Sequence, residues 1–249
     1  MQEKSLALSK EAERIILDTT KDRLVDIALR ADNADDYASV AGEKHGHFYE
    51  NLVFSSLDLG VSGGKALDLG TQFGLCAISL AKQDFDFEIT CFQDSRRFMN
   101  TGKKFAEKGM VEEKIRWALG NQESLPFADH SFDLVVSGFD MHHWENPVQV
   151  LHEIERITKT NGVILLGDLR RDAFGAMIPF VKTITHLLKK DMIYSELKHS
   201  FMASYKKSEA EALVKCAGLQ NCGVTSDLQF IYIKRARPEK KHIKVEISQ

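Results

Sequence analysis

The fold of this chain is decided by residues 66–82, which read Ala-Leu-Asp-Leu-Gly-Thr-Gln-Phe-Gly-Leu-Cys-Ala-Ile-Ser-Leu-Ala-Lys. A short apolar run contains Asp68 and ends at Gly70, and Gly74 precedes an apolar stretch. This order predicts a strand that turns sharply into a helix. Glycines let the backbone approach a ligand closely, and a helix N-terminus offers free N–H groups. The pattern therefore indicates a corner that can bind a nucleoside.

Strands and helices alternate after this corner. Ser95 and Asn146 are the expected N-caps of two helices, because both side chains can accept hydrogen bonds from the first turn. The apolar patterning predicts strands at 66–69, 87–92, 115–119, 132–137, 163–167, 220–226 and 228–234, and helices at 73–82, 95–108 and 146–158. We therefore expect an α/β fold with a seven-stranded, mostly parallel Rossmann-like sheet, its last strand antiparallel and helices on both faces.

Helical regions flank this sheet. We expect an N-terminal helical cap over residues 1–60 and a nucleoside-binding domain over 61–235. Within that domain, residues 170–204 are rich in large apolar side chains and predict a helical insertion or lid before the last two strands. Ser208-Glu-Ala-Glu211 predicts a capping box for the helix that follows. The cationic run from 234 to 244 is interpreted as solvated, with 236–249 as a basic tail.

Composition excludes several classes of protein. The 249 residues carry a net charge of −3, which gives no reason to expect a nucleic-acid partner. None of the apolar stretches approaches the roughly 20 residues that span a bilayer, and the N-terminus has no signal-peptide core. The four cysteines include no CxxC pair, so neither a zinc site nor a redox motif is predicted. We expect a cytoplasmic protein, whose oligomeric state stays open with a homodimer as one option.

The ordered set of motifs resembles the class I S-adenosylmethionine (SAM) methyltransferases over roughly residues 64–235. Residues 66–82 look like motif I of that family, usually apolar-Asp-apolar-Gly-x-Gly-x-Gly. Residues 88–95 look like the second strand and its end. Later motifs are Leu-Pro-Phe and Ser-Phe-Asp within 120–136, and Met-His-His-Trp at 141–144. The best match is the small-molecule branch related to quinone-biosynthesis methyltransferases, which implies SAM as the cofactor and a small-molecule acceptor.

Three positions depart from the family on the nucleoside side. Gln72 replaces the middle glycine, Gln93 stands where the family has the carboxylate that binds the ribose hydroxyls, and Asn121 replaces the acid that accepts the adenine amino proton. Neutral acceptors bind more weakly than charged ones, so each change costs on the order of 1 kcal/mol of affinity. The resemblance implies a cofactor site of Asp68, Gly70, Thr71, Gln72, Gly74, Gln93, Asp94, Asn121 and Gln122.

The loop after the fourth strand holds the candidate catalytic groups. Methyl transfer from a sulfonium is an in-line displacement, which depends on alignment and on exclusion of water. Where a base is needed, the candidates are Asp140, His142 and His143, because histidine can take a proton near pH 7. The alternative is that one of these rings only packs and bonds to the backbone.

Four further residues are expected near the acceptor. His45, His47 and Tyr49 precede motif I, where related enzymes cover the cofactor, and Arg170 follows the fifth strand. The alternative for Arg170 is an ion pair with Asp168 or Asp172. No metal site is predicted, since the histidines lack a pattern of carboxylate or cysteine ligands.

Two other function classes stay open on this evidence. A non-catalytic relative that binds a partner or a different nucleotide is motivated by Gln72, Gln93 and Asn121. An NAD-type dehydrogenase is the third interpretation, although the Leu-Pro-Phe and Ser-Phe-Asp run has no place in that family.

Overall fold

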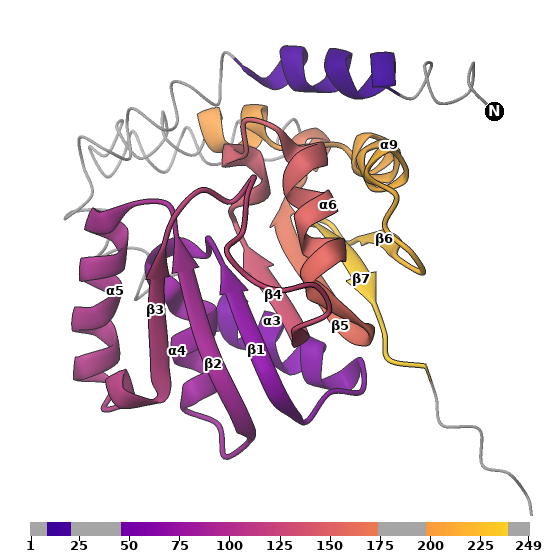
Figure 1. Ribbon diagram of the computed structural model, residues 1–249. Helices are drawn as coiled ribbons and strands as arrows, with labels where there is room; N and C mark the ends of the chain where they lie inside the picture. The colour runs from indigo at the N-terminus through magenta and orange to yellow at the C-terminus, as the bar shows by residue number, and fades with distance from the viewer. Residues whose placement is uncertain (1–8, 21–45, 174–197, 239–249) are drawn as a thin grey trace, which may run out of the picture.

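The computed structural model describes residues 9–20, 46–173 and 198–238. Its centre is a seven-stranded sheet with the order β3-β2-β1-β4-β5-β7-β6 (Figure 1). Five strands are parallel to one another: β1 (Gly63–Leu69), β2 (Asp86–Gln93), β3 (Ile115–Leu119), β4 (Phe132–Gly138) and β5 (Thr158–Leu169). β7 (Phe230–Arg235) is antiparallel to β5 and to β6 (Gly223–Ser226). The predicted fold class is therefore confirmed.

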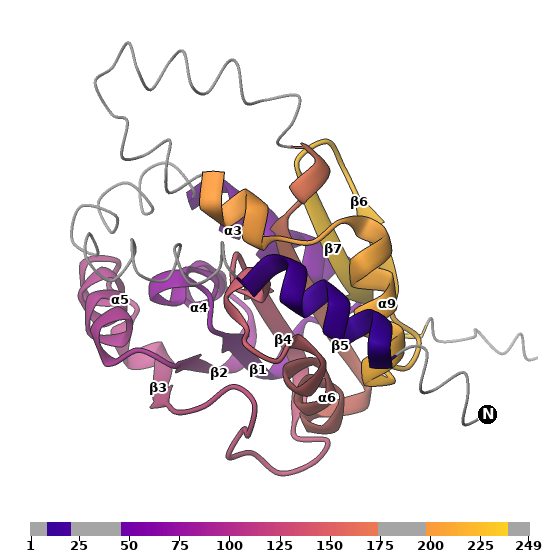
Figure 2. The same cartoon turned by 90° about the horizontal axis from the view of Figure 1, so that it is seen from above.

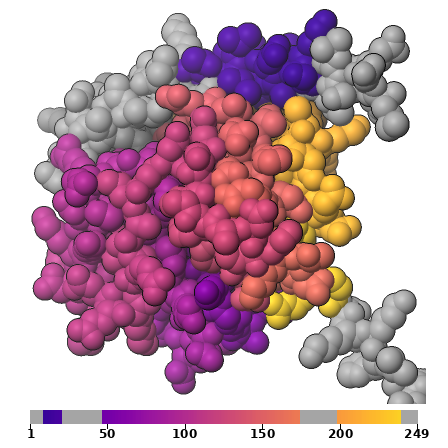
Figure 3. Space-filling model, in the orientation of Figure 1, coloured from indigo at the N-terminus to yellow at the C-terminus, as the bar shows by residue number. Residues whose placement is uncertain are grey.

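Helices cover both faces of the sheet (Figure 2). One face carries α3 (Gly46–Asp58), α4 (Leu75–Ala81) and α5 (Arg96–Lys108), and the other carries α6 (Pro147–Ile157) and α9 (Lys207–Ala217). Each face has its own apolar core. Helical residues 9–20 lie above the carboxyl edge of the parallel strands (Figures 1 and 3). Their Ala12 and Ile15 belong to the same apolar cluster as Met141 and Trp144.

The connection from β3 to β4 contains no helix. Instead, Arg156 of α6 donates hydrogen bonds to the carbonyls of Phe127 (2.8 Å) and Leu125 (3.0 Å). Glu153 pairs with Arg156 at 2.7 Å and accepts a bond from the Leu125 N–H at 2.8 Å. These bonds hold the connection against α6, so part of the face of β2 and β3 stays uncovered.

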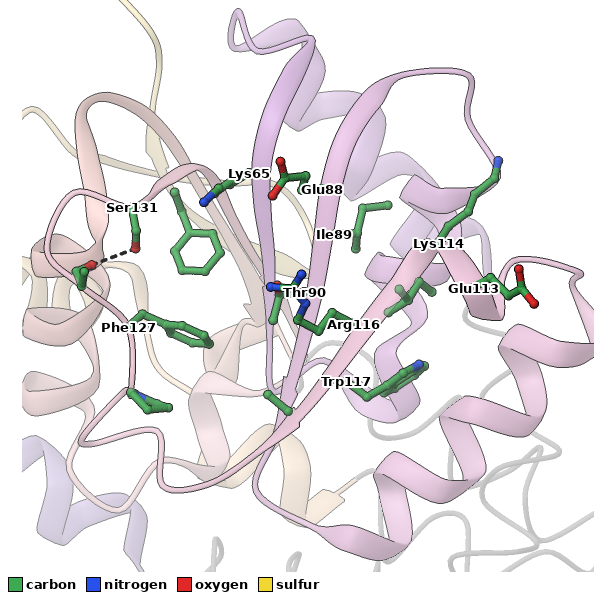
Figure 4. A pocket seen from close by; sticks show the side chains of 15 residues that line it. Lys65, Glu88, Ile89, Thr90, Glu113, Lys114, Arg116, Trp117, Phe127 and Ser131 are labelled. Carbon is green, nitrogen blue, oxygen red and sulfur yellow. Dashed lines mark hydrogen bonds between the residues drawn. The ribbon is translucent and has the colours of Figure 1, made fainter.

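The uncovered face forms a groove of about 550 Å³ (Figure 4). Its floor includes Glu88, Thr90 and Arg116, and Phe127 and Ser131 stand in the opposite wall. Because Glu88 and Thr90 lie in the first part of β2, this groove is distinct from the carboxyl edge where the predicted site residues lie.

The helix ends test the predicted caps. Ser95 accepts from Phe98 N (3.4 Å) and Asn146 from Gln149 N (3.2 Å), so both N-caps are confirmed. The capping box predicted at 208–211 is wrong. The N-cap of α9 is Lys206, because the carboxylate that reaches back to a free N–H is Glu209, which accepts from Lys206 N at 2.9 Å.

The cationic run after β7 begins inside the fold. Arg235 is 3% exposed, pairs with Glu155 at 2.9 Å and donates to the carbonyl of Gly162. Arg237 pairs with Asp133 at 3.4 Å. The interpretation of this run as solvated is therefore wrong for Arg235, whose position in the alternating strand β7 points it inward.

The predicted domains fall only partly on the described residues. Residues 9–20 and 46–58 are helical, and their assignment to an N-terminal cap stays a prediction. Positions 21–45, 174–197 and 239–249 lie outside the described residues, and with them most of the expected lid and tail. Within the described part of the chain, no helix has the length and apolar character needed to cross a bilayer.

Candidate functional site

The corner at residues 69–75 is shaped by Gly70. Its φ is +70°, a conformation that L side chains rarely adopt. A Cβ atom at this position would lie 1.9 Å from Asp140 Oδ2 and 2.7 Å from Gln122 Nε2. Two polar side chains therefore converge on the space that the missing side chain leaves open.

The helix after the corner begins later than predicted. A short 3-10 turn, η1 (Gln72–Gly74), precedes α4, and Phe73 has a φ of +55°. A Cβ at Gly74 would meet Cys91 Sγ at 2.7 Å and the Trp117 ring at 2.9 Å. Gly74 therefore allows close packing of the corner on β2 and β3, a structural role beside the ligand role that the resemblance implies.

Thr71 joins the ends of three strands. Its buried hydroxyl accepts a hydrogen bond from Gly138 N at the end of β4 (2.9 Å). Its carbonyl accepts one from Gln93 Nε2 at the end of β2 (2.8 Å). Since Thr71 follows β1, one residue fixes the carboxyl ends of β1, β2 and β4 relative to each other.

Asp68 is a buried acid at this edge. Only 1% of it is exposed, and its Oδ2 accepts from Ala77 N at 2.7 Å. Burial raises the pKa of Asp68 from 3.8 to about 7, and the nearby Asp140 carboxylate adds to the rise, while hydrogen bonds from Thr71 and Ala77 oppose it. At neutral pH the group therefore sits near its titration midpoint.

Several buried side-chain oxygens of the described residues have no hydrogen-bond partner, among them Asp68 Oδ1, Gln93 Oε1 and Gln122 Oε1 of the predicted cofactor site. These three come from β1, from the end of β2 and from the segment just after β3. Leaving buried acceptors unsatisfied costs about 1–3 kcal/mol each, so native proteins rarely do so without a ligand or water in place. The site therefore fits a ligand that carries several N–H or O–H donors.

The other predicted cofactor residues are placed differently. Gln72 is 2% exposed within η1. Asn121 is exposed, and its Oδ1 accepts from Glu123 N at 2.8 Å, which closes a local turn. Asp94 is also exposed, directly after Gln93. The structure thus gathers seven predicted cofactor residues around the corner, and holds Asn121 and Asp94 at its solvent side. The gathered residues are Asp68, Gly70, Thr71, Gln72, Gly74, Gln93 and Gln122.

The loop after β4 places the candidate catalytic groups. Asp140 Oδ2 accepts from the Trp144 indole N–H at 2.7 Å. His142 is 2% exposed, and its Nδ1 lies 2.7 Å from Asp168 Oδ1. The His142 N–H also donates to Asp168 Oδ2 at 2.9 Å. The His143 ring centroid is 3.9 Å from that of His142.

Asp168 was missed as a partner of histidine. Sequence reasoning paired it with Arg170, its near neighbour in the chain. In the structure Arg170 pairs with Asp172 at 2.9 Å instead, which agrees with the alternative given for it. The order of the strands could have predicted this pair. Asp168 lies near the carboxyl end of β5 and His142 comes just after β4, and these two strands are parallel neighbours.

The structure describes three of the four residues predicted near the acceptor, and it places them in different surroundings. His45 lies outside the described residues. His47 points to solvent, 3.5 Å from Glu50. Tyr49 is 1% exposed and packs edge-on against Phe139, with ring centroids 5.6 Å apart. The inner face of α3 thus buries Tyr49 in the core, and its contact with the acceptor stays a prediction.

Comparison with known proteins gives a consistent result. A model described as "Methyltransferase domain" matches residues 67–166. The chain is 30% identical over 169 residues to a demethylmenaquinone methyltransferase of Bacillus velezensis, covering 64% of this chain and 72% of that protein. It is 36% identical over 127 residues to the biotin biosynthesis bifunctional protein BioHC of Teredinibacter turnerae, covering 48% of this chain.

The chain spans a smaller share of several other relatives, whereas its likeness to solved structures extends over most of its length. The chain spans only 22% of the length of BioHC, and less than half of several other curated relatives. Among solved structures, it resembles the plantazolicin methyltransferase BamL, solved with a triazolic desmethylPZN analogue and S-adenosylhomocysteine. The TM-score is 0.67 at 13% identity, over 90% of this chain and 98% of that one.

Proposed function

Because this chain belongs to the class I SAM-dependent methyltransferases, we propose that it transfers the methyl group of SAM to a small-molecule acceptor by in-line displacement. SAM is the cofactor of this family. The observation that carries the proposal is the set of three orphaned acceptors at the carboxyl edge: Asp68 Oδ1, Gln93 Oε1 and Gln122 Oε1.

The residues at the corner fit this cofactor. SAM carries an ammonium group, two ribose hydroxyls and an adenine amino group, which are all donors. Asp68 would take the ammonium, Gln93 a ribose hydroxyl, and Gln122 with Asn121 the adenine amino group. Because Gly70 has no side chain, Asp140 and Gln122 can reach the backbone of the corner, where the ligand would bind. When bound, the cofactor supplies an electrophilic methyl group on a sulfonium.

His142 is the proton acceptor in this proposal. Asp168 binds the Nδ1 side of the ring, so the proton on Nδ1 is held and the other ring nitrogen is the basic one. A hydroxyl or thiol acceptor would pass its proton to that nitrogen as the methyl group arrives. Asp168 itself acts as a positioning residue. Its two oxygens fix both the ring and the backbone of His142.

A small acceptor is supported by the relatives. The Bacillus velezensis protein is named for demethylmenaquinone, and BamL was solved with a desmethyl analogue. In this chain the acceptor would lie by the 141–144 loop. Helical residues 9–20 pack over that loop (Figure 2), and we propose that they form part of a cap over the acceptor.

Calorimetric titration with S-adenosylhomocysteine tests the proposal. We expect saturable binding to the full chain, and weaker but still measurable binding in Asp68→Asn. No heat of binding at millimolar ligand overturns the proposal. A second assay follows labelled methyl from SAM into a panel of phenols, thiols and quinols. Tight binding with no transfer to any member supports the non-catalytic alternative instead.

A further inference from the structure

Two carboxylates meet beside Gly70. Asp68 lies at the end of β1, and Asp140 enters from the loop after β4, where its Oδ2 would lie 1.9 Å from a Gly70 Cβ. The two groups are 1% and 5% exposed. Both carboxylates are therefore poorly solvated, and the charge of Asp140 acts on Asp68, because such charges interact over several ångströms.

The position of Asp140 is fixed by its surroundings. The indole N–H of Trp144, which is 4% exposed, donates to Asp140 Oδ2 at 2.7 Å. Gln122 Nε2 approaches the same point over Gly70. A buried and hydrogen-bonded carboxylate keeps its orientation, so Asp140 presents a fixed negative group to the corner.

Asp68 has unused capacity to interact with a cation. Its Oδ1 has no hydrogen-bond partner, and no basic side chain of the described ranges pairs with it. Asp140 raises the pKa of Asp68 further, which is the sign of repulsion between the two acids. Positive charge placed between them relieves that repulsion.

Resting on the proposed function, we propose that Asp140 and Asp68 make this site select the cationic sulfonium form of the cofactor over its neutral thioether product. SAM has a net charge of +1, from a sulfonium, an ammonium and a carboxylate, whereas S-adenosylhomocysteine has none. Methyl transfer breaks the S–CH₃ bond and leaves its electron pair on sulfur. The attraction to the two acids falls at that moment, so the product leaves readily.

Binding measurements with three ligands test this selection. Sinefungin serves as the probe for charge, because it has an amine in place of the sulfonium and no transferable methyl group. For the unaltered chain we expect SAM and sinefungin to bind about tenfold more tightly than S-adenosylhomocysteine. Asp140→Asn keeps an oxygen that can accept from Trp144, and it should reduce this ratio severalfold. The matched control is Asp84→Asn, an exposed acid before β2 at the opposite edge, which should leave the ratio unchanged.

The outcomes separate the two proposals. If S-adenosylhomocysteine binds as tightly as sinefungin, or if Asp140→Asn leaves the ratio unchanged, charge selection is overturned while the methyltransferase function stands. If none of the three ligands binds the unaltered chain, the proposed function itself fails. Should Asp140→Asn not fold, Asp68→Asn provides the same test, because removal of either acid is expected to shift the ratio in the same direction.

Discussion

The side-chain amide of Gln93 donates a hydrogen bond to the main-chain carbonyl of Thr71 over 2.8 Å. A carboxylate at this position, as the related methyltransferases have, would have no proton to donate. Two oxygens would then face each other in a site where Gln93 is completely buried. A neutral amide thus suits this position, because its N–H group can donate to the Thr71 carbonyl. Its Oε1 has no partner among the described residues and can accept a hydrogen bond from a ligand.

Gln93→Glu should therefore destabilise the fold at high pH. We expect the free energy of unfolding to fall by roughly 1–3 kcal/mol at pH 8. The loss should shrink toward pH 5, because a protonated carboxyl group can donate to Thr71. Chemical denaturation at both pH values measures this. Gln220→Glu is the control, since that amide donates to the Gly218 carbonyl at the same 2.8 Å but is exposed. Equal losses in both variants would contradict the prediction.

Asp68 gives the site a dependence on pH. Burial raises its pKa in the folded chain to about 7, against 3.8 when exposed. The folded state therefore binds the proton more tightly, and its contribution to stability is full below about pH 3.8 and is lost as the pH rises to about 7. Asp68→Asn, which keeps an acceptor for Ala77 N, should be more stable than the unaltered chain by roughly 2–4 kcal/mol at pH 8 and nearly equal to it at pH 4.

Ligand binding should show the opposite trend. If ionised Asp68 binds the cofactor ammonium, affinity for S-adenosylhomocysteine rises as the pH passes through about 7. In Asp68→Asn the affinity should be low and independent of pH over that range. Calorimetry at several pH values measures both curves. A flat profile for the unaltered chain would remove Asp68 from the ligand contacts.

Gly70 and Gly218 allow a matched test of the corner. Their φ angles are +70° and +73°, so an alanine costs about 1 kcal/mol of backbone strain at either position. At Gly218 nothing lies within 4 Å of an added Cβ, whereas at Gly70 the carboxylate of Asp140 is in the way. Gly70→Ala should therefore lower the free energy of unfolding by roughly 2–4 kcal/mol and abolish ligand binding. Similar losses in the two variants, with binding retained, would show that the corner is not crowded.

Much of the fold could be predicted because apolar runs and caps are local signals. The strand Phe132–Gly138 is buried on both faces, and its central Leu-Val-Val is a short apolar run that the sequence reveals. Ser95 and Asn146 cap the helices that follow them. It is harder to predict to which side of a sheet or helix a given side chain points. Arg235 stands in a charged stretch, yet strand alternation turns it inward to Glu155.

The site was predicted as a set of residues but not as a set of contacts. Asp68, Gly70 and Gln93 were expected at the cofactor, and they do lie at one corner. The hydrogen bond from the Gln93 amide to the Thr71 carbonyl depends on how the ends of β1 and β2 lie relative to each other, and the local sequence does not encode this. Tyr49 was expected near the acceptor because helical spacing does not say which face of α3 meets the sheet. Pairing of Asp168 with His142 likewise needs the strand order.

The contact between His142 and Asp168 leads to the last prediction. If Asp168 positions His142 as the proton acceptor, His142→Gln and Asp168→Asn should each lower kcat about 10²-fold or more, with the affinity for S-adenosylhomocysteine unchanged. The double variant should be no slower than the worse single one, because the two residues act as one unit. His143→Gln, which alters the neighbouring ring, is the control and should keep most of the activity. Steady-state rates with a hydroxyl or thiol acceptor, measured from pH 6 to 9, would show in both variants the loss of the acidic limb, which is the fall in rate caused by protonation of a general base. Full activity in His142→Gln would mean that alignment of the methyl group alone drives the reaction, as an in-line displacement allows.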